Sequence, residues 1–226
     1  MQEQINTDLE RMQVFLHAME GGNSGFLAEL EKEARAQAVP IIRPGMQSLL
    51  KVILSYGKPE RILEIGCAIG FSAVLMAEYT PRETLVTTIE KDTARAMQAR
   101  ENFARAGVTD RVTLLEGDAA DILKTLEGPY QLIFMDAAKG QYPIFLEDAL
   151  RLLAPGGMLV SDNVLQEGEL LESHYAVQRR NRTIYKRMRE YLYTLQHTEG
   201  LVTTVLPVAD GAALTVKTGE VRLNLQ

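Results

Sequence analysis

The sequence of 226 residues has one cysteine, three histidines and no apolar run near the ~18 residues that a membrane span needs. With Cys67 as the only cysteine, no internal disulfide can form, which fits a reducing compartment. The first residues, Met1 to Asn6, do not show the basic and then apolar pattern of a signal peptide. We therefore expect a cytoplasmic protein that has no membrane partner.

The charge of the chain is also unusual in its distribution. The net charge of −6 argues against a protein that coats nucleic acid non-specifically. One segment, Val177 to Glu190, differs because it holds six basic residues and one acidic residue, a local net charge of +5. Five of the six are arginines, which bind oxyanions through two parallel hydrogen bonds. The segment is either a solvated helix face or a surface that recognises an oxyanion.

The first 56 residues read as helices, because their apolar residues recur at helical spacing and glycines and Pro40 interrupt them. The first predicted helix carries Ile5, Leu9, Met12, Leu16 and Met19. A second follows from Phe26 and stops before Pro40, and a third begins near Pro44. We expect apolar residues of this region, such as Phe15, Leu16 and Phe26, to pack on a second subunit.

From Gly57 onward, short apolar strands alternate with helices. The strands are apolar throughout, as in a parallel sheet covered by helices on both faces. Two later β-rich segments, joined through Asp210-Gly211, have no helix between them, so the last strand is predicted to run antiparallel. The sequence thus predicts one α/β domain, 1–226, with a helical cap (1–56) and a Rossmann-like, doubly wound, mostly parallel seven-stranded sheet (57–226). Its strands are Arg61–Gly66, Leu85–Glu90, Val112–Glu116, Gln131–Asp136, Met158–Asp162, Leu201–Leu206 and Leu214–Val216.

The loop after the first strand lacks a glycine that dinucleotide-binding loops need. Its glycine positions read Gly66-x-Ala68-x-Gly70, two residues after Glu64. In such loops the middle glycine lets the backbone touch a pyrophosphate, so Ala68 disfavours a nicotinamide dinucleotide. A ligand with a ribose and an amino-acid tail but no phosphates fits better.

Acidic residues at the ends of the first three strands point to the same ligand. Glu90 is placed to accept hydrogen bonds from ribose hydroxyls, and Asp118-Ala119 can face an adenine. Taken singly, Glu64 could cap a helix, Glu90 could be a surface residue and Asp118 an N-cap. Their shared position at three consecutive strand ends favours ligand binding.

A second constellation consists of Asp136-x-x-Lys139 and Asp162-Asn163. Two carboxylates and an amide oxygen suit Mg²⁺, Mn²⁺ or Ca²⁺ rather than zinc. The alternative is a pair of turn-forming residues. Because both acids stand at strand ends, the metal site is the better interpretation.

These motifs resemble the cation-dependent class I O-methyltransferases, which include catechol and caffeoyl-CoA O-methyltransferases. The resemblance runs from about Pro40 to the C-terminus and rests on Leu63–Ala73, Thr88–Glu90, Gly117–Ala119, Asp136–Lys139 and Asp162–Val164. Within that family, Val39–Ile42, Asp136–Tyr142, Asp162–Leu165 and the arginine-rich segment are most similar to the bacterial tRNA 5-hydroxyuridine methyltransferases.

The resemblance implies an S-adenosylmethionine site, a divalent metal and a homodimer. It places Gly66 and Ser72 at the methionine end of the cofactor, with Ile42 closing over it. Lys139 stands where the family often carries its proton acceptor, although it could equally be an exposed lysine. The complete expected set is Ile42, Glu64, Gly66, Ser72, Glu90, Asp118, Ala119 and Asp136 for the cofactor, Asp136, Asp162 and Asn163 for the metal, and Lys139 with Asp136 for catalysis.

The expected reaction is methyl transfer to a hydroxyl that has a second oxygen beside it, because a metal chelated by both oxygens favours the anionic hydroxyl. The main expectation is 5-hydroxyuridine at the wobble position of tRNA, giving 5-methoxyuridine, with Arg179, Arg180 and Arg182 on the anticodon-loop phosphates. The alternative is a small catechol or caffeoyl-type acceptor. A cofactor-binding protein without catalysis is a third possibility, which the retained acidic residues and Lys139 disfavour.

Overall fold

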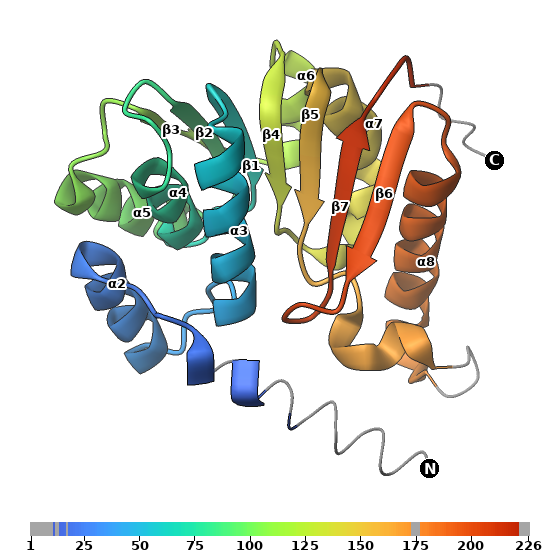
Figure 1. The fold of residues 1–226 in the computed structure, drawn as a ribbon, viewed down its shortest axis with the longest axis horizontal. Helices are drawn as coiled ribbons and strands as arrows, with labels where there is room; N and C mark the ends of the chain where they lie inside the picture. Colours follow the sequence, from blue (N-terminus) through green and yellow to red (C-terminus); the bar gives the residue numbers. More distant parts are fainter. Residues whose placement is uncertain (1–10, 12–13, 17, 173–176, 222–226) are drawn as a thin grey trace.

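Seven strands form one sheet in the computed structural model, which describes residues 11, 14–16, 18–172 and 177–221 (Figure 1). The strand order is β3-β2-β1-β4-β5-β7-β6. The first five strands are parallel, and β7 is antiparallel to both of its neighbours. This confirms the predicted fold class. The strands are β1 (Arg61–Ile65), β2 (Leu85–Glu90), β3 (Val112–Glu116), β4 (Tyr130–Met135), β5 (Leu153–Ser161), β6 (Leu201–Leu206) and β7 (Ala212–Lys217).

Helices cover both faces of the sheet and make two apolar cores. Neighbouring strand residues alternate between them: Ile62 and Phe134 belong to the first core, whereas Leu63 and Ile133 belong to the second. This alternation explains why the strands are apolar at every position. The first core includes α2 (Gly25–Ala36), α3 (Pro44–Gly57), α4 (Phe71–Glu78) and α5 (Thr93–Ala106), and the second includes α6 (Ala119–Thr125), α7 (Tyr142–Leu152) and α8 (Arg182–His197).

The arginine-rich segment is only partly in the long helix α8, which begins at Arg182. A single 3-10 turn, η3 (Arg179–Asn181), precedes it. Two further 3-10 turns, η1 (Lys139–Gln141) and η2 (Gln166–Leu171), follow the ends of β4 and β5.

The predicted first helix falls largely outside the described residues, which include neither Ile5, Leu9 nor Met12. Phe15 and Leu16 are exposed. Phe26 is half-buried against the first core, with the Arg105 guanidinium 4.9 Å from its ring centre. Packing on a second subunit therefore stays a prediction for Phe15 and Leu16, whereas Phe26 has its contacts within the chain. Among the described residues, no helix combines the length and apolarity needed to cross a bilayer.

One buried tyrosine ties together the two strand ends that carry the predicted metal ligands. The Tyr142 hydroxyl lies 3.1 Å from the Met135 carbonyl oxygen and 2.9 Å from that of Asp162. The Asp162 amide also donates to the Met135 carbonyl. Because Tyr142 is fully buried, bulk water does not compete with its hydroxyl for these carbonyl oxygens. The spacing of the β4 and β5 ends therefore depends on this side chain.

We expect Tyr142→Phe to lower the free energy of unfolding by about 1–2 kcal/mol, because the buried carbonyl oxygens lose a hydrogen-bond donor. Urea denaturation measures the change. Tyr193→Phe is the matched control, since Tyr193 is exposed and its ring stacking on His197 survives the change. Equal losses in the two variants would contradict the role assigned to the Tyr142 hydroxyl.

Candidate functional site

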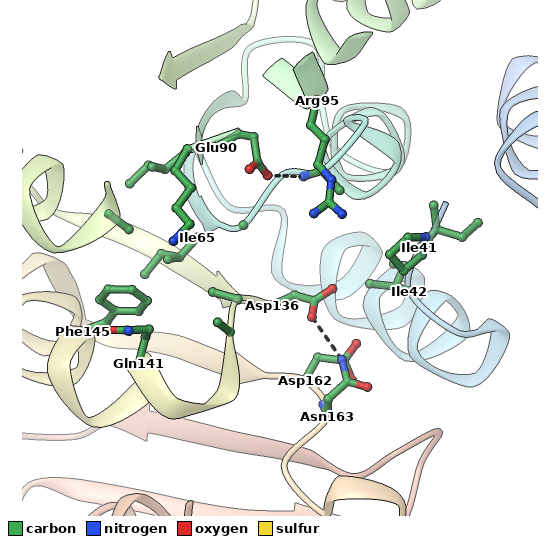
Figure 2. Close-up of a pocket in the computed structure, with 18 of the residues that line it drawn as sticks. Ile41, Ile42, Ile65, Glu90, Arg95, Asp136, Gln141, Phe145, Asp162 and Asn163 are labelled. Carbon is green, nitrogen blue, oxygen red and sulfur yellow. Dashed lines mark hydrogen bonds between the residues drawn. The ribbon is translucent and has the colours of Figure 1, made fainter. Parts of the chain in front are cut away.

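A cavity of ≈ 440 Å³ opens at the carboxyl ends of the parallel strands. It lies where the strand order reverses between β1 and β4, the usual ligand site of an open α/β sheet. Figure 2 shows Glu90 and Asp136 on two sides of the cavity, with Ile41 and Ile42 facing it from the segment before α3. Phe145 lies on the opposite side, so acidic and apolar groups share the walls.

The loop after β1 approaches the end of β4 so closely that no side chain fits between them. Gly66 has a φ of +99°, and a Cβ there would overlap the Asp136 carbonyl group. The Gly66 amide donates to the Ile89 carbonyl oxygen at 3.1 Å. The loop is therefore fixed by main-chain contacts to both neighbouring strands, and Gly66 lines the cavity.

Glu90 anchors the same loop and faces the cavity. Its Oε2 accepts from the Ala68 amide at 2.7 Å, and its Oε1 accepts from the Asp92 amide at 2.9 Å. The side chain is buried, yet it lines the cavity together with Asp118 and Ala119 at the end of β3. Asp118 also caps α6 by accepting from the Ala120 amide, so the capping and cavity-lining interpretations both hold.

Two residues predicted to contact the cofactor, Glu64 and Ser72, do not line the cavity. Glu64 is fully buried beneath the loop, where its carboxylate accepts from the Thr88 hydroxyl. Burial raises the pKa of Glu64 to about 7, although the Ser72 and Thr88 hydroxyls act in the opposite direction. Ser72 is also buried, so direct contact of Glu64 and Ser72 with a cofactor stays a prediction.

Asp136, Asp162 and Asn163 come together at the other end of the cavity, as predicted. Asn163 Nδ2 donates to Asp136 Oδ1 at 3.1 Å, and the Asn163 amide donates to Asp162 Oδ1 at 2.7 Å (Figure 2). Burial raises the pKa of Asp136 to about 6. Burial and then the charge of Asp136 raise the pKa of Asp162 to about 7. Two neighbouring carboxylates that repel each other in a buried place favour a cation between them.

The oxygen atoms present fit a hard divalent ion. Two carboxylates and the Asn163 side-chain amide supply such ligands. A 180° rotation of this amide would direct its oxygen, in place of its nitrogen, toward the two carboxylates. Within the described part of the chain, no group of three or more His, Cys, Asp or Glu side chains could hold a metal. The candidate centre therefore depends on the amide as well as the two acids.

Lys139 does not line the cavity. Its Nζ lies 3.1 Å from Oδ2 of Asp210, in the turn between β6 and β7.

The three arginines that were predicted to bind tRNA differ in their exposure. Arg179 and Arg180 are exposed on η3, whereas Arg182 is half-buried and donates to the Val177 carbonyl oxygen. Two of the three are thus available to a partner.

The cavity residues that the sequence did not point to include Arg43, Lys91, Arg95, Gln141 and Phe145. The Arg95 side chain extends from α5 toward the middle of the cavity (Figure 2). Arg43, Lys91 and Arg95 lie within five residues of Ile42 or Glu90, and Gln141 lies five residues after Asp136, so proximity in sequence was the available signal for these four. Nothing in their residue types distinguishes them from surface or core residues.

Comparison with known proteins shows the family of this chain. A family model described as O-methyltransferase matches residues 17–218, and the chain belongs to this O-methyltransferase family. The catechol O-methyltransferase of Niastella koreensis is 35% identical over 137 residues, which cover 59% of this chain and only 62% of that protein. The catechol O-methyltransferase of Mycobacterium tuberculosis is 36% identical over 160 residues, 70% of this chain and 73% of that one.

A solved structure shows the same likeness over more of the chain. The SAH-bound Podospora anserina methyltransferase PaMTH1 matches with a TM-score of 0.81 and 29% sequence identity. The match covers 92% of this chain and 94% of that chain. The fold, including the segments around the cavity, is thus shared along nearly the whole length.

The buried Glu64 carboxyl predicts a pH-dependent stability. Its pKa is raised in the folded protein, so its contribution to stability is complete below the unfolded pKa of 4.5 and is lost as the pH rises through about 7. Glu64→Gln removes this loss because glutamine stays neutral. We expect the melting temperature of Glu64→Gln, relative to wild type, to be higher at about pH 8.5 than at about pH 5.

Differential scanning fluorimetry at the two pH values measures this difference. Glu60→Gln is the control, because Glu60 is exposed just before β1. If Glu64→Gln and Glu60→Gln showed the same pH dependence, the buried carboxyl would not be the cause.

Proposed function

We propose that this protein transfers a methyl group from S-adenosylmethionine to one of two adjacent oxygens of a catechol-type small molecule, with a divalent metal ion. Membership of the O-methyltransferase family and two catechol O-methyltransferase relatives support the acceptor class. The observation that carries the proposal is the cluster of Asp136, Asp162 and Asn163 across the cavity from Glu90.

The cofactor half of the proposal rests on the ends of β1, β2 and β3. Glu90 presents a carboxylate to the cavity, which suits the two hydroxyls of a ribose. Gly66 offers main-chain atoms close to Asp136, and Asp118 with Ala119 borders the place for an adenine. The likeness to an SAH-bound methyltransferase structure supports this assignment.

The metal half rests on the chemistry of the donor set. Asp136, Asp162 and Asn163 would hold Mg²⁺, Mn²⁺ or Ca²⁺, since all three supply hard oxygen ligands. When bound, such an ion supplies Lewis-acid stabilisation of a deprotonated acceptor hydroxyl. The elevated pKa values of Asp136 and Asp162 support the proposal, because the pair has a strong electrostatic reason to take up a cation.

The chain itself has to orient the two reactants. Methyl transfer from a sulfonium is an in-line displacement, in which the new C–O bond forms as the C–S bond breaks. Glu90 and Asp136 fix the cofactor end and the acceptor end on separate strands, and Ile41 and Ile42 provide apolar cover from the α3 side. This arrangement would bring the donor and the acceptor into one cavity and reduce their contact with water.

A second candidate acceptor is 5-hydroxyuridine in tRNA, whose 5-hydroxyl also has a neighbouring oxygen. The exposed Arg179 and Arg180 on η3 favour it, because they are suited to phosphate contacts. Arg187 of α8 donates to the Gly140 carbonyl oxygen at 2.9 Å, so the basic segment lies against η1, next to the acceptor end. An anticodon loop held there would have a short path to the cavity.

Metal dependence tests the first proposal. We expect EDTA, or the substitution Asp162→Ala, to lower methyl transfer from labelled S-adenosylmethionine to catechol by at least about 100-fold, because the acceptor oxyanion loses its main stabilisation. Excess Mg²⁺ should restore the EDTA-treated wild type but not the variant. Asp110→Asn serves as a control, since Asp110 is exposed near the amino end of β3, away from the cavity. Full activity in EDTA would sink the proposal.

The tRNA candidate is tested by a double substitution, Arg179→Ala with Arg180→Ala. We expect weaker methylation of tRNA that carries 5-hydroxyuridine, and a salt dependence of binding reduced by about 2 in log–log slope, with catechol methylation unchanged. Arg35→Ala with Arg82→Ala is the matched control, because both arginines are exposed elsewhere. Unchanged tRNA methylation and salt dependence would rule out this docking surface.

A further inference from the structure

Asp210 is a buried acid whose only sequence signal was a turn. It lies between β6 and β7, is 5% exposed, and its Oδ2 is 3.1 Å from Nζ of Lys139. The lysine begins η1, three residues after Asp136, so the pair joins two segments 71 residues apart. A carboxylate buried to this degree is costly unless a partner compensates for its lost hydration.

The main chain around Asp210 is attached to the end of β5. The Leu165 amide donates to the Asp210 carbonyl oxygen at 2.9 Å, and the Val164 amide donates to that of Gly211 at 3.0 Å. Gly211 has a φ of +86°, and a Cβ there would overlap the Leu165 side chain. These bonds fix the Asp210 carboxylate relative to the segment that directly follows Asp162 and Asn163.

The ion pair also borders the candidate metal ligands. The Lys139 ammonium is close enough to Asp136 to act against the upward shift of its pKa, and the Asp210 charge adds to the upward shift at Asp162. The Lys139 side chain is 30% exposed to solvent, whereas the Asp210 side chain is 4% exposed. The fixed partner is therefore the acid, and the long, flexible partner is the lysine.

We infer that Asp210 is a positioning residue that holds the Lys139 side chain beside the candidate metal ligands, just outside the lining of the cavity. This inference rests on the proposed methyl transfer. Two physical arguments support it. A buried ion pair adds little net stability compared with apolar packing, so stability alone is a weak reason for it. A lysine stem with four rotatable bonds occupies many positions unless an anchored acceptor selects one, and small displacements of a reacting group slow catalysis strongly.

A double-mutant cycle tests whether Asp210 acts through Lys139. The four proteins are wild type, Asp210→Asn, Lys139→Met and the double variant, assayed with catechol, Mg²⁺ and labelled S-adenosylmethionine. We expect Asp210→Asn to lower kcat by between about 10- and 100-fold with KM for S-adenosylmethionine unchanged. In the Lys139→Met background, the same substitution should cause no further loss of kcat.

Two controls distinguish a specific loss of catalysis from a general loss of structure. Asp148→Asn breaks a 2.9 Å ion pair with Arg151 on α7 and should leave kcat unchanged. Calorimetric binding of S-adenosylhomocysteine shows whether each variant keeps its cofactor site. If Asp210→Asn does not fold, Asp210→Glu, which displaces the charge by one methylene, should show the same non-additive loss.

Failure of the positioning role and failure of the proposed function give different results. Equal losses of kcat from Asp210→Asn in both backgrounds, or an unchanged kcat in Lys139→Met, would overturn the positioning role while the proposed function stands. If wild type transferred no methyl group to catechol, the proposed function would fail and the inference with it.

Discussion

The burial of carboxylates at one edge of the sheet is the constraint on which the rest of the site depends. Glu64 in β1, Glu90 at the end of β2 and Asp162 directly after β5 are each less than a tenth exposed. Negative groups gathered in a place of low dielectric repel one another and resist ionisation, so each needs a donor, a cation or a proton. Glu90 accepts from two main-chain amides and Glu64 accepts from the Thr88 hydroxyl, whereas Asp162 lies next to a second acid, Asp136, with Asn163 as the donor to Asp136.

This constraint also explains why the two sides of the cavity suit different ligand groups. On the β1–β3 side, neutral donors of the main chain satisfy the acid, which leaves the Glu90 carboxylate available to hydroxyl groups. On the β4–β5 side, Tyr142 and Asn163 hold the strand ends together but leave two acids without enough compensation. One side therefore suits a polar neutral ligand surface such as a ribose, and the other suits a cation and an anionic oxygen.

Much of the fold and of the candidate site could be predicted from the sequence. The carboxyl ends of parallel strands meet at one edge of a sheet, whatever the lengths of the segments that connect the strands. Glu90, Asp136 and Asp162 were identified in this way, as was the antiparallel hairpin. Burial depth and long-range partners could not be predicted. Asp210 reads as a turn residue because Asp-Gly favours turns locally, and only the tertiary fold places Lys139 against it. Likewise, no local signal puts Glu64 beneath its loop rather than in the cavity.

The backbone at Asn163 has a consequence for which residues can stand there. Its φ is +58°, in the left-handed region that asparagine tolerates far better than glutamine or a β-branched residue. Glycine would accept the conformation but bring no oxygen ligand, and aspartate would add a third negative charge to an already repulsive pair. Conformation and electrostatics thus limit the residue type at position 163 independently, and asparagine satisfies both.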